Sequence, residues 1–461
     1  MIQSLDFDFD FVRHYDLGGP RYTSYPAVNH FKASVTEHHY RKWARKSNED
    51  PIPRPLSLYV HIPFCGSPCA FSTANSVVAK DHSKVAAYLD HLGREIAMQA
   101  ALFDNDRIVE QIHYGGGTPT LLSNDEIRKL MAVTRRHFSL LTDDEGDYSV
   151  KIDPYSVDFG RLEVLREASF NRLSLGIQDI TPTGQKAPDP VHGLEVLREV
   201  TESVRKLGFK SINVELVYGL PDETAESFQQ TLQAVTEMCP ERVALYNYVH
   251  LPEYLKPQLR VNETDLPDAD ETLAILQHSI DHLAGADYVY IGMDHFARPD
   301  DELALAQRRG NLQYDFQGYS THADCDLVGL GVSAISKVCD NYSQNLQELD
   351  EYIERIGAGR FALQRGVEPE LDDLLRAEII NELICDSFLD IEKLEKKRRI
   401  SFARHFSTEI QVLLKMQDEG LLTVERKSLQ VLPRGRLLVR NICMVFDRYP
   451  HNGRANLSRV I

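Results

Sequence analysis

The chain of 461 residues has no run of about 18 apolar residues, which is the length that a membrane-spanning helix requires. Its first residues, MIQSLDFDFDF, lack the basic and apolar segments of a secretory signal. An excess of positive charge is also missing, because 51 Lys and Arg residues face 69 Asp and Glu residues, for a formal net charge of −18. We therefore expect a cytoplasmic protein without general affinity for nucleic acid or for anionic membranes.

Cysteine is scarce as well. The seven cysteines are scattered along the chain, except for Cys65 and Cys69. This distribution fits a reducing compartment better than a disulfide framework. The length permits one large barrel-type domain and a smaller second domain.

The close pair, Cys65 and Cys69, follows the apolar run 56–60. That run is short, rich in β-prone residues and closed by Pro63, so it predicts a buried strand. Loops after strand ends carry the chemistry of α/β barrels, and thiolates there are soft ligands for zinc or iron–sulfur centres. Two cysteines complete neither a tetrahedral zinc site nor the three protein-held corners of a cubane cluster.

Residues 56 to about 340 alternate between β-type runs and amphipathic helical runs. The predicted strands are 56–60, 108–114, 148–152, 172–176, 211–218, 243–248 and 288–292, and the predicted helices are 83–102, one beginning near Ser123, 159–168, 193–207 and 224–238. Alternation of this kind without internal hairpins predicts parallel strands joined by crossover helices.

The two ends of the chain have a different character. Residues 1–55 form an expected N-terminal extension, in which GGPRYTSYP predicts irregular structure, either a tethered coil or a cover over a site. The barrel is expected over 56–345 and a C-terminal helical domain over 346–461. In that last part we expect helices at 346–356, 371–387, 391–416 and 434–446 and a hairpin of 420–424 with 428–431. The hairpin resembles the wing of a winged-helix unit, and the net charge favours a packing role over DNA binding.

Several long stretches of the chain carry a family resemblance. They are GPRYTSYP, HIPFCGSPCAF, GGGTPT, SVKIDP, NRLSLGIQD, VYGLP, IGMDHFARPDDELA, GLGVSAIS and RLLVRNIC. On these stretches the chain resembles the oxygen-independent coproporphyrinogen III dehydrogenases (oxidases), which are radical S-adenosylmethionine (SAM) enzymes of haem biosynthesis. The resemblance implies an α/β fold with a partial (β/α)6 barrel, SAM and a [4Fe-4S] cluster, and oxidative decarboxylation of two propionates of coproporphyrinogen III to vinyl groups.

The resemblance also implies which residues meet the cofactors. Cofactor contacts are expected at Tyr59, Gly115, Gly116, Gly117, Thr118, Lys151, Gln178, Glu215, Val249 and Ile335. Cluster ligands are expected at Cys65 and Cys69, with the third ligand position at Ser72 and a further family cysteine at Ala74. By itself, a glycine run also fits a tight turn, and a strand-end tyrosine also fits a core position.

Besides Ala74, four positions depart from the family pattern. Ser72 replaces a cysteine, and its hydroxyl has a far higher pKa than a thiol and is a harder donor. Lys151 stands where the family has a glutamate near the SAM sulfonium, which reverses a favourable charge. Pro190 lies where the family has an arginine contact, and Glu215 lengthens an aspartate by one methylene.

These departures lead to three hypotheses. The first expects a non-radical member of the family that binds a tetrapyrrole or a partner, with the cluster absent or unstable and SAM bound weakly. The second expects an active decarboxylase whose third cluster ligand is non-standard, supplied by His61, His82 or a remote cysteine. The third expects a haem-binding or haem-delivery protein. Iron and sulfide content after anaerobic reconstitution separates the enzyme from the binding proteins.

Overall fold

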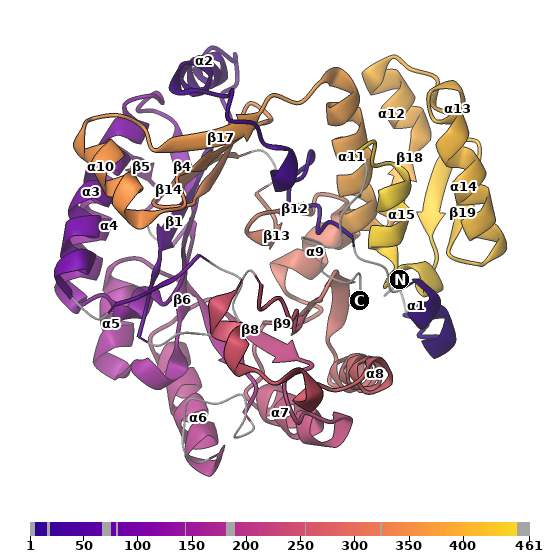
Figure 1. Ribbon diagram of the computed structural model, residues 1–461, viewed down its shortest axis with the longest axis horizontal. Helices are drawn as coiled ribbons and strands as arrows, with labels where there is room; N and C mark the ends of the chain where they lie inside the picture. The colour runs from indigo at the N-terminus through magenta and orange to yellow at the C-terminus, as the bar shows by residue number, and fades with distance from the viewer. Residues whose placement is uncertain are drawn as a thin grey trace. The chain divides into compact units, whose positions relative to one another are not determined.

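The computed structural model describes residues 5–15, 19–66, 75–79, 82–142, 144–180, 190–253, 255–322 and 325–449. The chain folds into two compact units, and both are discontinuous in sequence (Figure 1). The larger unit comprises Phe31–Asp268 and Asp324–Glu368, and the smaller unit comprises Met1–His30, Ala269–Ala323 and Pro369–Ile461. The boundaries of these two units fall elsewhere than residues 55 and 345. The expected division into three consecutive parts remains a prediction.

The larger unit is built on a run of parallel strands in the order β9-β8-β7-β6-β4-β1. The strands are β1 (Leu56–Ile62), β4 (Ile108–Gly116), β6 (Asp147–Ile152), β7 (Arg172–Gln178), β8 (Ser211–Tyr218) and β9 (Arg242–Asn247). The connecting helices, which lie outside the sheet in Figure 1, are α3 (His82–Ala100), α4 (Asn124–His137), α5 (Phe159–Glu167), α6 (Pro190–Lys206) and α7 (Ala225–Glu237). The predicted α/β fold with parallel strands and crossover helices is therefore confirmed.

Local sequence explains where these helices begin. Helix α4 starts after Ser123, whose hydroxyl accepts a hydrogen bond from the backbone N–H of Glu126, while the Glu126 carboxylate accepts one from the Ser123 backbone at 2.8 Å. This reciprocal capping box satisfies two N–H groups that a helix end leaves without partners. It confirms the helix start that was predicted near Ser123.

The expectation that 56–340 contains no hairpins is wrong. Strand β14 (Asp326–Leu330) pairs parallel with β1, and antiparallel strands β15 (Ile335–Val338), β16 (Asn341–Asn345) and β17 (Leu363–Val367) follow it. The β15–β16 turn consists of Cys339 and Asp340, which both have positive φ (49° and 65°). Two left-handed residues make the turn that suits a tight hairpin, but a Cys-Asp pair lacks the usual Asn-Gly signal.

The expectation of an irregular extension over residues 1–55 is also wrong in part. Helix α2 (Glu37–Asn48) begins with a capping box at Thr36 and buries Tyr40, Trp43, Ala44 and Ser47 at helical spacing. The indole N–H of Trp43 donates to the Glu368 carboxylate at 2.7 Å, which connects helix α2 to the last residue of the larger unit. The remaining elements of this unit are β2 (Phe64–Cys65), β3 (Val77–Val78), η2 (Pro119–Leu121), β5 (Ser139–Leu140), η3 (Pro154–Ser156), η4 (Lys256–Arg260), η5 (Glu263–Asp265) and α10 (Leu349–Gly357).

The smaller unit is mainly helical. Its elements are α1 (Phe9–Tyr15), η1 (Val28–His30), α8 (Ala269–Gly285), β10 (Val289–Gly292), β11 (His295–Ala297), α9 (Glu302–Arg309), β12 (Gln313–Asp315), β13 (Gly318–Ser320), α11 (Leu371–Asp386), β18 (Phe388–Asp390), α12 (Ile391–Arg398), α13 (Phe402–His405), α14 (Ser407–Asp418), β19 (Leu422–Val424), β20 (Ser428–Val431), η6 (Pro433–Gly435) and α15 (Val439–Val445). The predicted hairpin is confirmed as β19–β20. The predicted strand near 288–292 is confirmed as β10, but it pairs antiparallel with β11 and does not continue the parallel series. The prediction of a single helix over 391–416 is wrong, because Arg399 is left-handed (φ 55°) and ends α12, and two further helices follow.

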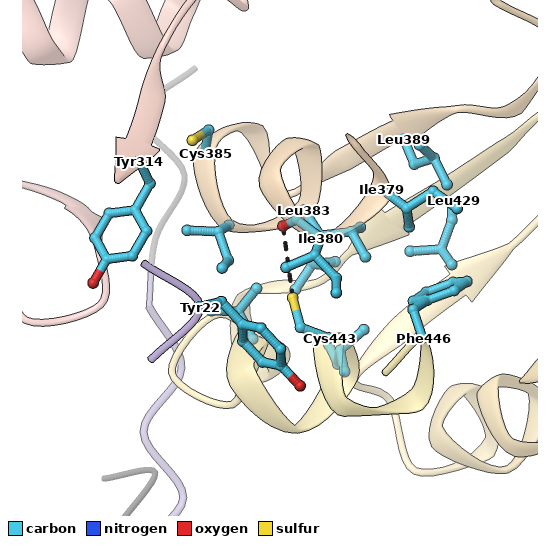
Figure 2. Close-up of a cluster of buried hydrophobic side chains, with 14 of the residues drawn as sticks. Tyr22, Tyr314, Ile379, Ile380, Leu383, Cys385, Leu389, Leu429, Cys443 and Phe446 are labelled. Carbon is cyan, nitrogen blue, oxygen red and sulfur yellow. Dashed lines mark hydrogen bonds between the residues drawn. The ribbon is translucent and has the colours of Figure 1, made fainter. Parts of the chain in front are cut away.

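A hydrophobic core joins the three segments of the smaller unit. Figure 2 shows α11 residues such as Ile380 and Leu383 packed with Cys443 and Phe446, which follow the C-terminal strands. The Cys443 thiol donates to the carbonyl of Ile380 at 3.8 Å, and burial raises the pKa of this thiol. Cys443 is therefore a core residue rather than an exposed thiolate. Among the residues that the structure describes, no helix is both long and apolar enough to cross a membrane.

Candidate cofactor site

One face of the parallel sheet is polar. Along β1, the even positions are buried apolar residues, and the odd positions are Ser57, Tyr59 and His61. The same two-residue period in the neighbouring strands presents Gln111 and His113 on β4, Ser149 and Lys151 on β6, Ser174 on β7, and Asn213 and Glu215 on β8. His113, Ser149, Ser174 and Asn213 were not among the residues expected at this site, although the alternation of polar residues along their strands is a signal that places them on one face.

Tyr59, His113 and Ser149 lie side by side in register across β1, β4 and β6. The rings of Tyr59 and His113 stack with centroids 5.8 Å apart and planes 20° apart. Ser149 donates to the carbonyl of Ile112, so its hydroxyl accepts a hydrogen bond from Nδ1 of His113 at 2.7 Å. Burial lowers the pKa of His113 to about 4, so the imidazole is neutral near pH 7 with its lone pair on Nε2.

Lys151 and Glu215 form an ion pair on the same face. The Lys151 ammonium contacts Oε2 of Glu215, and the Ser174 hydroxyl donates to Oε1 at 2.7 Å. Asn213 in turn donates to the Ser174 hydroxyl at 2.9 Å. Burial alone raises the pKa of Glu215, but the Lys151 charge and these hydrogen bonds outweigh it and lower the pKa, so the carboxylate stays ionised. The positive charge expected at position 151 is therefore neutralised inside the protein.

The glycine segment Gly115–Gly117 is packed against the end of β1. The N–H of Gly117 donates to the carbonyl of Ile62 at 2.8 Å, and the N–H of Thr118 donates to the carbonyl of Phe64 at 2.7 Å. A Cβ atom on Gly117 would lie 2.3 Å from the Phe64 carbonyl oxygen, and Gly116 has a φ of 104°. Close approach of two backbones thus explains the glycines, and Gly116 and Gly117 remain partly exposed on the other side.

Cys65 follows the carboxyl end of β1, next to the glycine segment, where its thiol is buried. The prediction that these two segments converge at the carboxyl ends of the strands is therefore confirmed for Cys65. Cys69, Ser72 and Ala74 lie outside the described residues, as does the side chain of Pro190.

The suggested substitute ligands for iron already have other partners. Both ring nitrogens of His61 are engaged, Nε2 with the carbonyl of Asn75 at 2.9 Å and Nδ1 with the Tyr59 hydroxyl at 3.1 Å. His82 is exposed and pairs with the capping residue Glu126 at 3.0 Å. These contacts hold the imidazole of His61 at both nitrogens and that of His82 at Nε2.

The other described cysteines of the larger unit lie at the opposite edge of its sheet. Cys239 follows α7, just before β9 begins, and Cys325 directly precedes β14. Cys339 donates its backbone N–H to Asp326, the first residue of β14, at 3.1 Å. Since parallel strands begin at one edge and end at the other, these thiols are separated from Cys65 by the length of a strand.

Three further predicted contacts also lie near the carboxyl edge. Gln178 ends β7 with a φ of 67°, and Val249 follows β9 with its carbonyl accepting a hydrogen bond from Gln258 at 3.0 Å. Ile335 begins β15, which runs antiparallel to β14 and therefore starts at the edge where β14 ends. All three are thus placed at the same edge of the sheet as Cys65 and the glycine segment.

A buried polar network connects this edge of the sheet to helix α3. The Tyr88 hydroxyl donates to the carbonyl of His61 at 2.6 Å and accepts from the N–H of Val332 at 3.2 Å. The carboxylate of Glu95 accepts hydrogen bonds from Gly331 at 2.6 Å and Tyr352 at 2.6 Å. Burial raises the pKa of Glu95. The network fixes the end of β1 and the loop after β14 to helix α3.

The motifs at the two ends of the chain meet in the smaller unit. Arg21 of GPRYTSYP pairs with Asp294 at 2.5 Å, and Arg440 of the last motif donates to the carbonyl of Pro20 at 3.1 Å. The segment is thus held by specific contacts. A role in covering a site remains a prediction.

Comparison with known families first defines the class of protein. Residues 59–235 match the Radical SAM superfamily, and residues 370–438 match the HemN C-terminal domain. The first match covers the parallel strands from β1 to β8 and the polar face described above.

Whole-chain relatives then define the family. The chain is 44% identical to the oxygen-independent coproporphyrinogen III oxidase of Pseudomonas aeruginosa, over 100% of both chains. It is 42% identical to the enzyme of that name from Escherichia coli, over 97% of this chain and 96% of the relative. The solved structure of coproporphyrinogen III oxidase (HemN) from Escherichia coli, a radical SAM enzyme, superposes with a TM-score of 0.90 at 40% identity. The match covers 97% of this chain and all of the other. The chain belongs to the oxygen-independent coproporphyrinogen III oxidase family.

The described residues fit part of what SAM and an iron–sulfur cluster require. The Glu215 carboxylate is a group that attracts a sulfonium cation, and the partly exposed Gly116 and Gly117 admit close backbone contact. Cys65 offers one thiol to iron. Lys151 disfavours binding of a cation on this face, because its ammonium already forms an ion pair with Glu215.

Proposed function

We propose that this protein catalyses the oxygen-independent oxidation of coproporphyrinogen III, the reaction for which its relatives are named. The observation that carries the proposal is 44% identity to such an oxidase over the full length of both chains. The stacked Tyr59 and His113 rings, and the glycine segment held against the strand before Cys65, support a cofactor site at this edge. The scattered cysteines favour the cytoplasm as its location.

Each propionate that becomes a vinyl group loses carbon dioxide, one proton and two electrons. SAM and the cluster, when bound, would supply the radical chemistry that takes one hydrogen atom, which accounts for the proton and one electron, and the second electron requires a one-electron acceptor. Cys65 and Cys69 would hold iron as thiolates, with the serine at position 72 as a harder donor. Tyr59, the glycine segment and Glu215 would bind SAM. The neutral His113 keeps further positive charge away from the sulfonium.

A second candidate function is tetrapyrrole binding without radical chemistry. The specific observation in its favour is the Lys151–Glu215 ion pair, together with a serine at position 72. In that case the protein retains the fold and a place for the macrocycle, while SAM and the cluster are held weakly.

The test is an anaerobic assay of reconstituted protein with SAM, a strong reductant and coproporphyrinogen III. We expect 5′-deoxyadenosine and vinyl-bearing product from the wild type and neither from Cys65→Ala. Absence of both products, with coproporphyrin III still bound in a fluorescence titration, would support the second candidate. Absence of turnover and of tetrapyrrole binding would overturn both functions.

A further inference from the structure

Glu215 is the acidic side chain in the carboxyl half of the polar face, among the described residues that line it. The other carboxylate on this face, Asp147, begins β6 and pairs with Arg172 at 2.6 Å. Within the strands, a cationic ligand at the carboxyl half of this face therefore meets Glu215, whereas Asp153 caps η3 after the end of β6 and Asp179 is buried after the end of β7.

Both oxygens of Glu215 are occupied by protein groups. The Lys151 ammonium takes Oε2 and the Ser174 hydroxyl takes Oε1. The ion pair still borders solvent, because the side chain of Lys151 is 31% exposed and that of Glu215 is 20% exposed. A ligand can therefore reach the Glu215 carboxylate, provided that the Lys151 ammonium moves away from Oε2.

We infer that Lys151 is a built-in competitor for Glu215 and selects against ligands that carry a positive charge at this point. The inference rests on the proposed function in placing the SAM site on this face. SAM carries a sulfonium, whereas S-adenosylhomocysteine has the same nucleoside and amino acid with an uncharged thioether. Lys151 consequently lowers the affinity for SAM and leaves that for S-adenosylhomocysteine almost unchanged.

Calorimetric titration of both nucleosides into the wild type and Lys151→Met tests the inference. We expect the ratio of SAM affinity to S-adenosylhomocysteine affinity to rise about tenfold or more in Lys151→Met, because a carboxylate whose Oε2 has lost the lysine replaces an ion pair near the sulfonium. Lys151→Arg keeps the charge and should keep the wild-type ratio. Lys129→Met removes an exposed lysine of α4 and serves as the matched control.

The double variant Lys151→Met/Glu215→Gln removes both charges and should lose the gain. The double variant also replaces Lys151→Met in the titrations if Lys151→Met proves unstable, since it has no carboxylate at position 215 that has lost its lysine. An unchanged ratio in Lys151→Met, a raised ratio in Lys151→Arg, or no binding of either nucleoside by Lys151→Met would overturn the inference. These titrations contain no tetrapyrrole, so failure of the proposed oxidase activity is a separate result.

Discussion

Thr118 and Phe64 are joined by a backbone hydrogen bond of 2.7 Å, which fixes the glycine segment to the residue that precedes Cys65. The two segments are 54 positions apart in the sequence, yet their backbones touch closely enough to exclude a side chain. Any change that separates them should disturb the candidate cofactor site as well as stability.

Gly117→Ala should lower the free energy of unfolding by about 1–3 kcal/mol, because the new Cβ would meet backbone atoms that cannot move freely. Urea unfolding measures the change. Gly66→Ala is the control, since a Cβ there meets nothing within 4 Å. Equal effects of the two substitutions would contradict the close packing.

The Lys151–Glu215 pair should show a coupling free energy of about 1–2 kcal/mol in a double-mutant cycle with Lys151→Met and Glu215→Gln. Each single change breaks the ion pair and keeps one of its two charges, whereas the double change removes both charges. Urea unfolding of the four proteins gives the coupling. Additive effects would show that the pair contributes little to stability.

His113 should make the protein less stable as the pH falls from about 6.5 to about 4. Burial depresses the pKa of this imidazole to about 4, so over that range the unfolded chain binds a proton that the folded chain does not. Between pH 7.5 and pH 5 the loss should be on the order of 1–2 kcal/mol. His113→Gln should reduce this loss in urea unfolding, and the exposed His38→Gln should not. Identical pH profiles for wild type and His113→Gln would refute the assignment.

Glu223 should make the protein less stable as the pH rises from about 4.5 to about 8. Burial, followed by the nearby charge of Asp179, raises the pKa of Glu223 to about 8, so the folded state holds a proton that the unfolded state releases. Glu223→Gln keeps an oxygen for the N–H of Gly219 and should raise the melting temperature more at pH 8.5 than at pH 5. Scanning calorimetry of this variant and of the exposed Glu226→Gln tests the difference. A shift of the same size at both pH values would count against it.

Ser72→Cys with Ala74→Cys should increase the iron and sulfide that survive a chelator challenge after anaerobic reconstitution. A thiolate loses its proton far more readily than a hydroxyl and is a softer ligand for iron. The double variant should approach about four irons per chain. If the wild type retains as much iron as the variant, the residue at position 72 does not limit cluster binding.

Local sequence was sufficient for much of the larger unit. The alternation of strands and helices predicted parallel pairing, and Ser123 with Glu126 marked a helix start, because capping and hydrophobic period act within a few residues. The position of Cys65 after a buried strand also predicted its place at the carboxyl edge. These features depend on neighbours in the chain, so they can be seen without the fold.

Other features were decided only by tertiary structure. The ion pair joins Lys151 and Glu215 across 64 residues, and no local pattern reports which charges a sheet will bring together. The Cys339-Asp340 turn is left-handed because strands β15 and β16 require it, although its residues carry no such preference. Sequence alone therefore indicated the fold class and the edge that holds the candidate site, whereas strand register determined the charge that a ligand would meet there.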